Sequence, residues 1–269
     1  MTRSDFGREV PLAELRDVRV QRDGRTILDV ERLALRQGEH VAILGPNGAG
    51  KSTLLATLLR DVLPYPGDVE PEVRLLGKPR WDLFEARRIL GAVSDDLQDL
   101  YDRGVSVEDA VVSGFFGSIG LYPHQDVTAE MRQRAEDVVR FLEIERLVGR
   151  RMDTLSTGEA RRALIGRALV HDPLALVLDE PCDGLDPHVT WRFLALLRRI
   201  AQEGRTLILV THRIEDIVPE VSRVIMMKDG LVFRDGPKAE LLADEALSEL
   251  FDIPARVEER DGRYRLWFA

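Results

Sequence analysis

The chain has 269 residues, which is long enough for one large α/β domain with a well-buried core. Hydrophobic residues make up 44% of the chain and charged residues 32%, close to ordinary globular usage, so the composition excludes a disordered chain. The formal net charge of −9 argues against a broad basic surface, and no nucleic-acid partner is therefore expected.

The sequence offers no segment suited to crossing a bilayer. The longest stretch without Asp, Glu, Lys or Arg, residues 110–125, contains glycine, proline and histidine and is shorter than the roughly 20 apolar residues that a spanning helix needs. The first ten residues carry charge where a signal peptide needs an apolar segment. Cys182 is the single cysteine, so no disulfide or thiolate zinc cluster can form within the chain, and no neighbouring base marks it as a nucleophile. These features lead us to expect a cytoplasmic protein.

The first part of the chain predicts an antiparallel strand pair and then a strand, a loop and a helix. Residues 12–20 and 26–35 alternate in polarity around an Asp-Gly turn. Residues 40–44 form a short apolar run that ends in a glycine-rich turn, and a sequence of helical composition begins at Lys51. Residues 97–169 predict a helical lobe inserted into the α/β core. Helical spacing recurs in this lobe over residues 129–142 and 158–169.

Beyond this lobe the pattern returns to strands. Residues 174–181 and 206–212 are continuous apolar runs, typical of strands buried on both faces of a parallel sheet, and a helical pattern covers residues 187–202 between them. Residues 223–233 predict a hairpin with an Asp-Gly turn, and helical segments follow over residues 237–250.

The tail, residues 255–269, alternates around a further Asp-Gly pair and predicts a second hairpin. We expect it to stabilise the edge of the domain rather than to serve as a dedicated partner site. The whole chain is predicted to be a single domain. Its expected parts are an α/β core with an antiparallel part over residues 12–96 and 170–250, the helical lobe over 97–169 and the hairpin extension over 251–269.

Residues 45–52 match the pattern G-x-x-x-x-G-K-[ST] after a predicted strand and before a predicted helix, which is the context that this phosphate-binding motif requires. Its glycines let successive backbone N–H groups point at phosphate oxygens, and the helix adds the positive end of its dipole. Lys51 would then bridge the β- and γ-phosphates, and Ser52 would bind Mg²⁺. The alternative, a chance match in a glycine-containing turn, is disfavoured by this context.

Acidic and imidazole side chains follow the two later apolar runs. Asp179 would hold Mg²⁺, and Glu180 is placed to polarise an attacking water as a general base. His212 follows the next strand and could donate a hydrogen bond to the γ-phosphate. Each feature alone is compatible with ordinary strand-end solvation or a structural histidine, but their order after a phosphate loop favours a shared site at one sheet edge.

Together these motifs resemble those of the ATP-binding cassette (ABC) ATPases, over roughly residues 12–245. Residues 45–53 look like the Walker A loop and residues 176–180 like Walker B. Residues 184–186 look like the D-loop, and His212 looks like the switch histidine. The most diagnostic motif is LSTGE at residues 155–159, which is similar to the signature LSGGQ. The resemblance implies a P-loop NTPase core with a mainly parallel sheet, an N-terminal antiparallel β subdomain and an inserted helical subdomain. It also implies ATP hydrolysis with Mg²⁺. The nucleotide-contacting residues that it implies are Arg22, Gly45, Pro46, Asn47, Gly48, Ala49, Gly50, Lys51, Ser52, Thr53, Ser156, Thr157, Gly158, Glu159 and Asp186.

In the family, two such domains pack head to tail, so the resemblance implies an ATP-dependent homodimer in which Ser156 and Gly158 contact the γ-phosphate bound by the other subunit. Three departures stand out. Arg22 replaces the aromatic ring that usually stacks on adenine, and a guanidinium can also stack on a base. Asp95 aligns with the Q-loop glutamine as a catalytic and Mg²⁺-binding candidate, Gln98 being the alternative through a shifted alignment. In the signature, Thr157 and Glu159 replace a glycine and the glutamine.

Two functions fit this resemblance. The first is the motor of a transporter whose membrane permease subunits are separate chains, on the inner face of the membrane, importing a small substrate such as a metal chelate or an oxyanion. Phe115 and Phe116 could then line the groove that receives the permease, or they could belong to the core of the helical lobe. The second is a non-transporting ATP-driven switch that acts on a protein or nucleic-acid partner.

Overall fold

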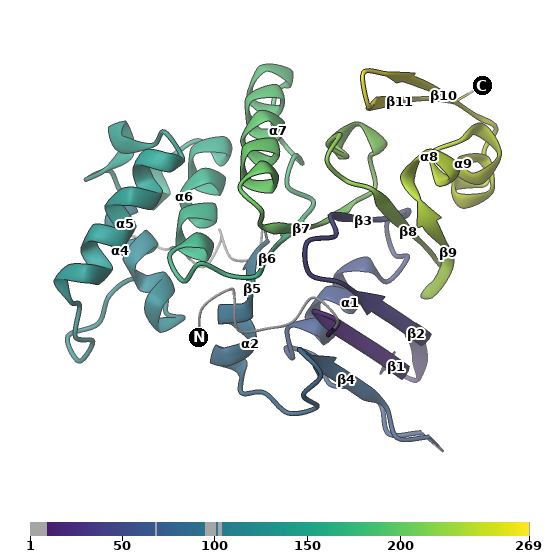
Figure 1. Ribbon diagram of the computed structural model, residues 1–269, viewed down its shortest axis with the longest axis horizontal. Coiled ribbons are helices and arrows are strands. Elements are labelled where there is room, and N and C mark those ends of the chain that lie inside the picture. The colour runs from purple at the N-terminus through teal and green to yellow at the C-terminus, as the bar shows by residue number, and fades with distance from the viewer. Residues whose placement is uncertain (1–9, 68, 95–100, 102–103, 269) are drawn as a thin grey trace.

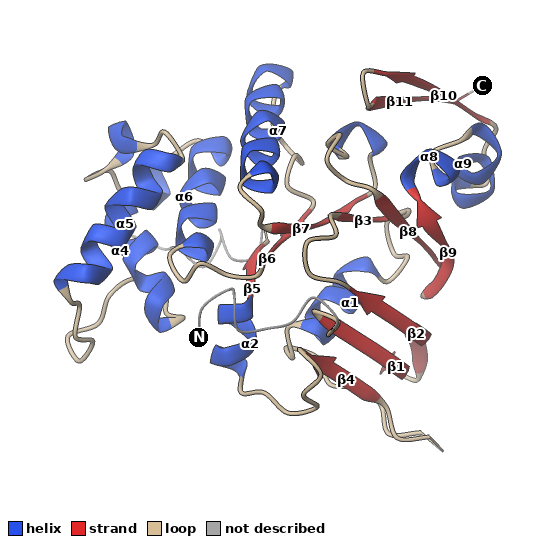
Figure 2. Ribbon diagram, in the orientation of Figure 1, coloured by secondary structure: helices blue, strands red, loops and turns tan. Residues whose placement is uncertain are grey.

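The computed structural model describes residues 10–67, 69–94, 101 and 104–268. In this part of the chain nine strands form one mixed sheet in the order β4-β1-β2-β9-β8-β3-β7-β6-β5, which crosses the middle of the molecule (Figures 1 and 2). The strands are β1 (Ala13–Arg22), β2 (Arg25–Leu35), β3 (Val41–Leu44), β4 (Glu72–Leu75), β5 (Leu90–Val93), β6 (Ala175–Asp179), β7 (Thr206–Thr211), β8 (Arg223–Lys228) and β9 (Leu231–Pro237).

Helices cover the sheet on both faces, with α4, α5 and α6 gathered at one end of the molecule and α1 beside β1 and β2 (Figure 1). They are α1 (Lys51–Leu58), α2 (Leu83–Ile89), α4 (Val107–Ser113), α5 (Ala129–Phe141), α6 (Thr157–Leu169), α7 (Pro187–Gln202), α8 (Lys238–Leu241) and α9 (Asp244–Phe251). Short 3₁₀ turns connect them: η2 (Gly114–Phe116), η3 (Glu145–Leu147), η4 (Met152–Thr154) and η5 (Ile214–Asp216).

The central strands are apolar throughout because they are buried on both faces. In β3, Ala42 and Leu44 join the apolar cluster that includes α4 to α7, whereas Val41 and Ile43 join the cluster that includes α1, β1 and β2. Side chains alternate between the faces of a strand, so each run of this kind supplies both cores at once. The apolar runs predicted to be buried parallel strands are confirmed, since β3 pairs in parallel with β7 and β7 with β6.

The predicted antiparallel pair is also confirmed, because β1 and β2 pair from Ala13↔Leu35 to Arg22↔Arg25. This part joins the rest of the sheet where β2 meets β9, through the parallel pair Asp29↔Leu231. Gly230, with φ of +80°, allows that approach, since a Cβ there would lie only 2.6 Å from the carbonyl oxygen of Ile27. The sheet is therefore continuous from its antiparallel to its parallel part.

The predicted helices of the lobe are confirmed, with α5 and α6 close to their expected bounds. The helices of the lobe begin at hydroxyl residues. The Thr128 side chain accepts a hydrogen bond at the start of α5, and the Ser106 side chain does so at the start of α4. Their apolar faces pack together in one core with α7, which Asp186 caps and Pro187 opens. The short elements α2, β4 and β5 were not predicted.

Both predicted hairpins form. β8 and β9 pair antiparallel, and so do β10 (Ala255–Arg260) and β11 (Arg263–Phe268). Backbone N–H groups of the second hairpin donate hydrogen bonds to the body: Leu266 to Glu215 Oε1 at 3.1 Å, Val257 to Asp244 Oδ1 at 2.7 Å and Ala255 to Ser248 Oγ at 2.9 Å. It thus rests on η5. Among the helices in the described part of the chain, none has the length and hydropathy to cross a membrane.

Candidate nucleotide-binding site

Three neighbouring parallel strands bring the predicted site residues to one sheet edge. β3 lies beside β7 with Leu44 opposite Thr211, and β7 lies beside β6 with Val210 opposite Asp179. The glycine-rich loop follows β3, His212 follows β7 and Glu180 follows β6. Since the carboxyl ends of parallel strands meet at the same edge, residues far apart in sequence become neighbours in space.

The glycine-rich loop is shaped by backbone constraints that only glycine satisfies. Gly48 and Gly50 have φ of +82° and +91°, in the left-handed region. A Cβ at Gly50 would also lie 2.8 Å from the carbonyl oxygen of Ile27, because β2 runs directly against the loop. α1 begins next, with no side-chain cap and no acidic residue in its first turn. Its free N–H groups and positive dipole end are therefore open to an anion.

Lys51 is held at the base of this loop with only 5% of its surface exposed. Its ammonium donates to the carbonyl oxygens of Gly45 at 2.8 Å and Pro46 at 3.1 Å, and lies 3.3 Å from Glu180 Oε1. A buried ammonium needs such partners because leaving it unpaired costs several kcal/mol. The Lys51–Glu180 ion pair was not predicted.

Glu180 connects this lysine to the histidine. Its second carboxylate oxygen, Oε2, lies 2.9 Å from His212 Nδ1 and accepts a hydrogen bond from the His212 backbone N–H at 3.2 Å. The backbone of Glu180 has φ of +44°, and its N–H donates to the Val210 carbonyl at 2.9 Å. A carboxylate fixed in this way, between a cation and an imidazole, is equipped to accept a proton from a water molecule.

Two sets of groups at this edge could bind a cation. Glu180, His212 and Asp183 each present a ligand atom, and these atoms lie within 4.8 Å of one another. Mg²⁺ prefers oxygen ligands, so the imidazole makes this set a poor fit. Ser52, the exposed second residue of α1, and Asp179, the last residue of β6, carry oxygen ligands, which fit Mg²⁺ better. Asp183 was not singled out from the sequence, because nothing in its local pattern distinguishes it from a loop aspartate.

Residues of the signature motif form the N-terminus of α6. The Ser156 hydroxyl accepts from the Glu159 N–H, and the Glu159 carboxylate accepts from the Ser156 N–H at 3.1 Å, which completes a capping box. Arg146 and Arg150 lie 2.8 and 3.5 Å from this carboxylate. Burial acts to raise the pKa of Glu159, but the Ser156 hydrogen bonds and the two arginines outweigh it, and the pKa is lowered. Glu159 is therefore a capping residue that carries a negative charge.

Other signature and D-loop residues have contacts within the chain. Gly158 is buried, and a Cβ there would lie 2.5 Å from Val189 Cγ1, so a larger residue would force the Val189 side chain on α7 to shift. Thr157 is exposed. The Asp186 carboxylate accepts from the backbone N–H groups of His188 at 2.9 Å and Val189 at 3.0 Å, which makes it the N-cap of α7. Its predicted contact with nucleotide remains a prediction.

Comparison with known proteins identifies the family. The family model described as "ABC transporter" matches residues 28–183, and the cobalt import ATP-binding protein CbiO of Rhodobacter capsulatus is 38% identical over 223 residues, 83% of this chain and 77% of that protein. This chain belongs to the ABC transporter ATPases. Its fold resembles the solved structure of CbiO1 from Clostridium perfringens, part of the ABC transporter complex CbiONQ, with a TM-score of 0.73 and 30% identity over 90% of this chain and 94% of that one.

A second solved structure shows the ABC ATPase assembly. A dimeric ATP-binding cassette in a post-hydrolysis state, bound to ADP and phosphate, has a TM-score of 0.68 and 26% identity, covering 84% of this chain and 98% of its own. The activity of this chain is therefore ATP hydrolysis by an ABC-type ATPase, and the predicted α/β fold of that family is confirmed.

Arg22 is the residue of this ABC ATPase that was predicted to stack on adenine. Arg22 ends β1 and is exposed at the tip of the β1–β2 pair, whose second strand contacts the glycine-rich loop through Ile27. Asp95 and its alternative Gln98 lie outside the described residues. Cys182 is fully buried, and burial raises the pKa of its thiol, so it is not equipped to act as a nucleophile.

Phe115 and Phe116 both pack against the core of the helical lobe, as the second of the two interpretations expected. Phe115 also meets the His171 ring edge-on, with centroids 5.1 Å apart, and lines a surface cavity. The two interpretations are thus compatible for Phe115.

Proposed function

We propose that this ABC ATPase binds ATP at the sheet edge formed by β3, β7 and β6 and powers the import of a small substrate. In this proposal it works as a head-to-tail homodimer with separate permease subunits, on the cytoplasmic face of the membrane. The observation that carries the catalytic part is the chain of contacts from Lys51 through Glu180 to His212.

These contacts assign a role to each residue. The ammonium of Lys51 is already oriented toward the loop, so phosphate oxygens of ATP would replace the Glu180 carboxylate as its anionic partner. That exchange leaves Glu180 free to take a proton from the attacking water, while His212 stays within hydrogen-bond distance of the same carboxylate. The backbone N–H groups of residues 45–53 would surround the phosphates, and Arg22 would stack on the base.

Mg²⁺ would be held by Ser52 and Asp179, with Asp95 as a further candidate from the sequence. When bound, the ion neutralises charge that develops on the transferred phosphoryl group. The oxygen ligands that these residues carry support this assignment, since hard cations prefer such ligands.

The homodimer follows from where the signature lies. α6 belongs to the helical end of the molecule, whereas the phosphate loop follows β3 and opens α1 near the antiparallel part (Figure 1). A second copy in head-to-tail arrangement would bring the N-terminus of its α6 to the phosphates held by the first. The exposed Ser156 and Thr157 support this arrangement, and so does the dimeric relative.

A groove between the helical lobe and the core is the proposed docking site of the permease. Its cavity measures about 340 Å³ and is bounded by α2, β5, η2 and the end of α6, with Phe115 among its lining residues. Arg88 and Arg167 give it a basic character, whereas Arg87 forms an ion pair with Asp61 of the same lining. An amphipathic permease segment that carries acidic or amide side chains would complement it.

The class of substrate is proposed from relatives. CbiO of Rhodobacter capsulatus is named for cobalt import, and CbiO1 is described as part of a transporter complex. A metal ion, its chelate or a small oxyanion is therefore the proposed cargo.

The variant Glu180→Gln tests the catalytic proposal. Gln keeps the size and the hydrogen bonds of the side chain but cannot accept a proton, so we expect ATP binding within about threefold of wild type and turnover at least about 100-fold lower. An ATP-bound dimer should accumulate, measured by size-exclusion chromatography with ATP and by phosphate release.

Glu245→Gln, an exposed change on α9, serves as the matched control and should behave like wild type. Undiminished steady-state hydrolysis by Glu180→Gln would show that Glu180 is not the base.

A further inference from the structure

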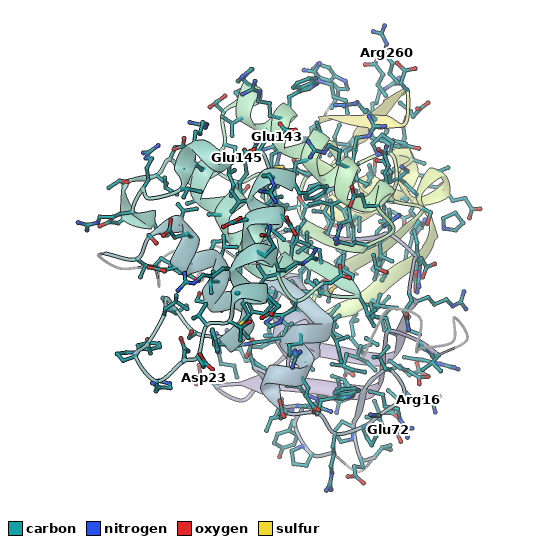
Figure 3. All side chains as sticks on the ribbon, turned by 60° about the vertical axis from the view of Figure 1, so that its left-hand side comes forward. Arg16, Asp23, Glu72, Glu143, Glu145 and Arg260 are labelled. Carbon is teal, nitrogen blue, oxygen red and sulfur yellow. The ribbon has the colours of Figure 1, made fainter. Side chains whose placement is uncertain are left out.

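A second charged cavity lies away from the nucleotide edge, between α6, α7 and the segment that follows α5. Its volume is about 260 Å³. The charged side chains that line it are four arginines and one glutamate, and an indole ring lines it as well: Arg146, Arg162, Arg192, Arg199, Glu143 and Trp191. Figure 3 shows Glu143 among the helices of this end of the molecule. In a chain with a net charge of −9, such a basic cavity is a local exception.

Two of the four arginines already have acidic partners. Arg199 forms an ion pair with Glu143, and Arg146 lies 2.8 Å from Glu159 Oε1. By contrast, Arg162 on α6 and Arg192 on α7 form no ion pair within the described part of the chain. The cavity therefore holds more positive charge than the protein itself neutralises.

The environment of Arg162 shows that this charge is costly. Arg162 is half-buried, and burial followed by repulsion from Arg192 lowers the pKa of its guanidinium, with Arg146 and Arg199 adding to the effect and Glu143 opposing it. A guanidinium remains charged at any physiological pH, so it cannot relieve the repulsion by losing its proton. An anion bound between the two helices would relieve it.

This cavity is distinct from the two sites already described. Arg162 lies in the first half of α6, whereas the proposed permease groove meets the other end of that helix, at Arg167 and His171. The phosphate loop contributes no residue to it.

We infer that this cavity is a second anion site, which binds a compact phosphate or diphosphate group through the unpaired guanidinium groups of Arg162 and Arg192. Each guanidinium presents a planar fork of N–H donors that matches two phosphate oxygens. The volume lies just below the roughly 300–1,000 Å³ of small-molecule pockets, so it suits a phosphate group better than a whole cofactor. The ring of Trp191, 58% exposed, lies at the rim where a nucleotide base could stack.

The group could come from a free diphosphate or from a nucleotide, and calorimetry can separate these sources. The experiment uses the full chain with Lys51→Ala, which weakens phosphate binding at the main site, and titrates it with pyrophosphate at low ionic strength. We expect saturable binding that adding Arg162→Gln and Arg192→Gln weakens at least about tenfold. The paired exposed changes Arg256→Gln and Arg263→Gln on the C-terminal hairpin are the matched control and should leave it unchanged.

A second titration with ADP identifies the source. If ADP binds more tightly than pyrophosphate and still needs Arg162 and Arg192, the ligand is a nucleotide that uses Trp191, and the tryptophan emission should shift. If pyrophosphate binds as tightly as ADP, the ligand is a free diphosphate. Both results support the site.

Two outcomes would overturn the proposal. The first is pyrophosphate binding of equal affinity and stoichiometry with and without the two arginines. The second is no saturable pyrophosphate binding. If the otherwise wild-type Arg162→Gln, Arg192→Gln protein then also loses the ATP-dependent dimer, the arginines belong to a contact between chains. Folding of this variant is checked by its thermal unfolding midpoint, which should not fall, since like-charge repulsion has been removed.

Discussion

Glu180 shows how single residues are fixed at the sheet edge formed by β3, β7 and β6. Its φ of +44° is uncommon for a residue with a long side chain and costs on the order of 1–3 kcal/mol. The Val210 carbonyl holds its N–H, and Lys51 and His212 hold the two oxygens of its carboxylate. These contacts hold the Glu180 conformation in this structure, and those to Val210 and His212 would remain in place if phosphate oxygens replaced Glu180 as the partner of Lys51.

A second constrained acid follows His212 in the chain. Asp216 in η5 is 1% exposed and accepts a hydrogen bond from the Thr211 hydroxyl at 3.0 Å. Burial raises the pKa of this carboxyl, and the charge of Glu215 adds to it, although Arg213 and the hydrogen bonds from Thr211 and Cys182 act in the opposite direction. The folded protein therefore holds this proton more tightly than the unfolded chain.

The sign of the pH dependence follows. The contribution of Asp216 to stability is complete below its unfolded pKa of about 3.9 and is lost as the pH rises through the higher folded value. Asp216→Asn keeps an acceptor for Thr211 and cannot ionise. We expect it to raise the free energy of unfolding by on the order of 1 kcal/mol at pH 8, with a smaller gain at pH 5.

Urea denaturation at the two pH values measures this difference. Glu245→Gln, an exposed change on α9, is the comparison and should not show a gain of this kind. A loss of stability in Asp216→Asn at pH 8 would contradict the account.

At the scale of elements, α6 illustrates how a helix terminus serves two purposes. Within one protomer, its capping box provides hydrogen-bond partners for N–H groups at the N-terminus, and the arginines pair with the charge of Glu159. The same terminus is proposed to meet the γ-phosphate of a second copy, where a carboxylate adds unfavourable charge.

The variant Glu159→Gln separates these two effects. Gln retains hydrogen bonds to Ser156 but removes the negative charge, so we expect about fivefold tighter ATP-dependent dimerisation, measured by analytical ultracentrifugation. The loss of two partly exposed ion pairs should lower the free energy of unfolding by less than about 1 kcal/mol. Glu159→Ala, which also breaks the capping box, should be the less stable of the two. Weaker dimerisation of Glu159→Gln would argue against a nearby phosphate.

Elements with strong local signals could be predicted from the sequence, and those that depend on neighbours could not. Local sequence is enough to predict the apolar runs of β6 and β7, the capped pattern of α7 and the Asp-Gly hairpins. β5 is only four residues long, and its glycine at position 91 is required because a Cβ would lie 2.8 Å from the Ala168 carbonyl of α6. Such a strand is defined by the helix packed on it, which no local pattern reveals.

The same distinction applies to the candidate site. The positions of Glu180 and His212 at strand ends, and of Lys51 after the loop that follows β3, could be inferred from motif order, because parallel strands align their carboxyl ends. Their mutual contacts could not, since the Lys51–Glu180 ion pair depends on distances set by the whole sheet. The close contact between position 158 and the side chain of Val189 could not be predicted either.

At the scale of the whole molecule, the phosphate loop and the signature belong to different parts of one continuous sheet-and-helix body. The proposed chemistry therefore needs two copies, each of which supplies half of the surroundings of a triphosphate. ATP then acts as a ligand that favours the closed pair, and hydrolysis removes that preference.

Ser156→Arg tests this division of the site. A bulky cation at the tip of α6 should block the approach of the second copy, so we expect ATP hydrolysis to fall at least about tenfold and the ATP-dependent dimer to disappear. Nucleotide affinity of the monomer, measured with a fluorescent ATP analogue, should stay within about twofold. Gln133→Arg adds the same charge to the exposed face of α5 and should retain dimer and turnover. A monomeric Ser156→Arg protein with full turnover would refute the two-copy site.

The C-terminal hairpin has a practical bearing on how this protein is handled. The Leu266 N–H of β11 donates a hydrogen bond to the side chain of Glu215, three residues beyond His212. The C-terminal end of the chain is therefore connected to the segment that follows this histidine. We expect a tag fused after β11 to weaken the hydrogen bond from Leu266 to Glu215, which hydrogen exchange at the Leu266 N–H would measure. Removal of β11 would remove this hydrogen bond altogether, so a shortened chain should be compared with the full-length protein before its activity is interpreted.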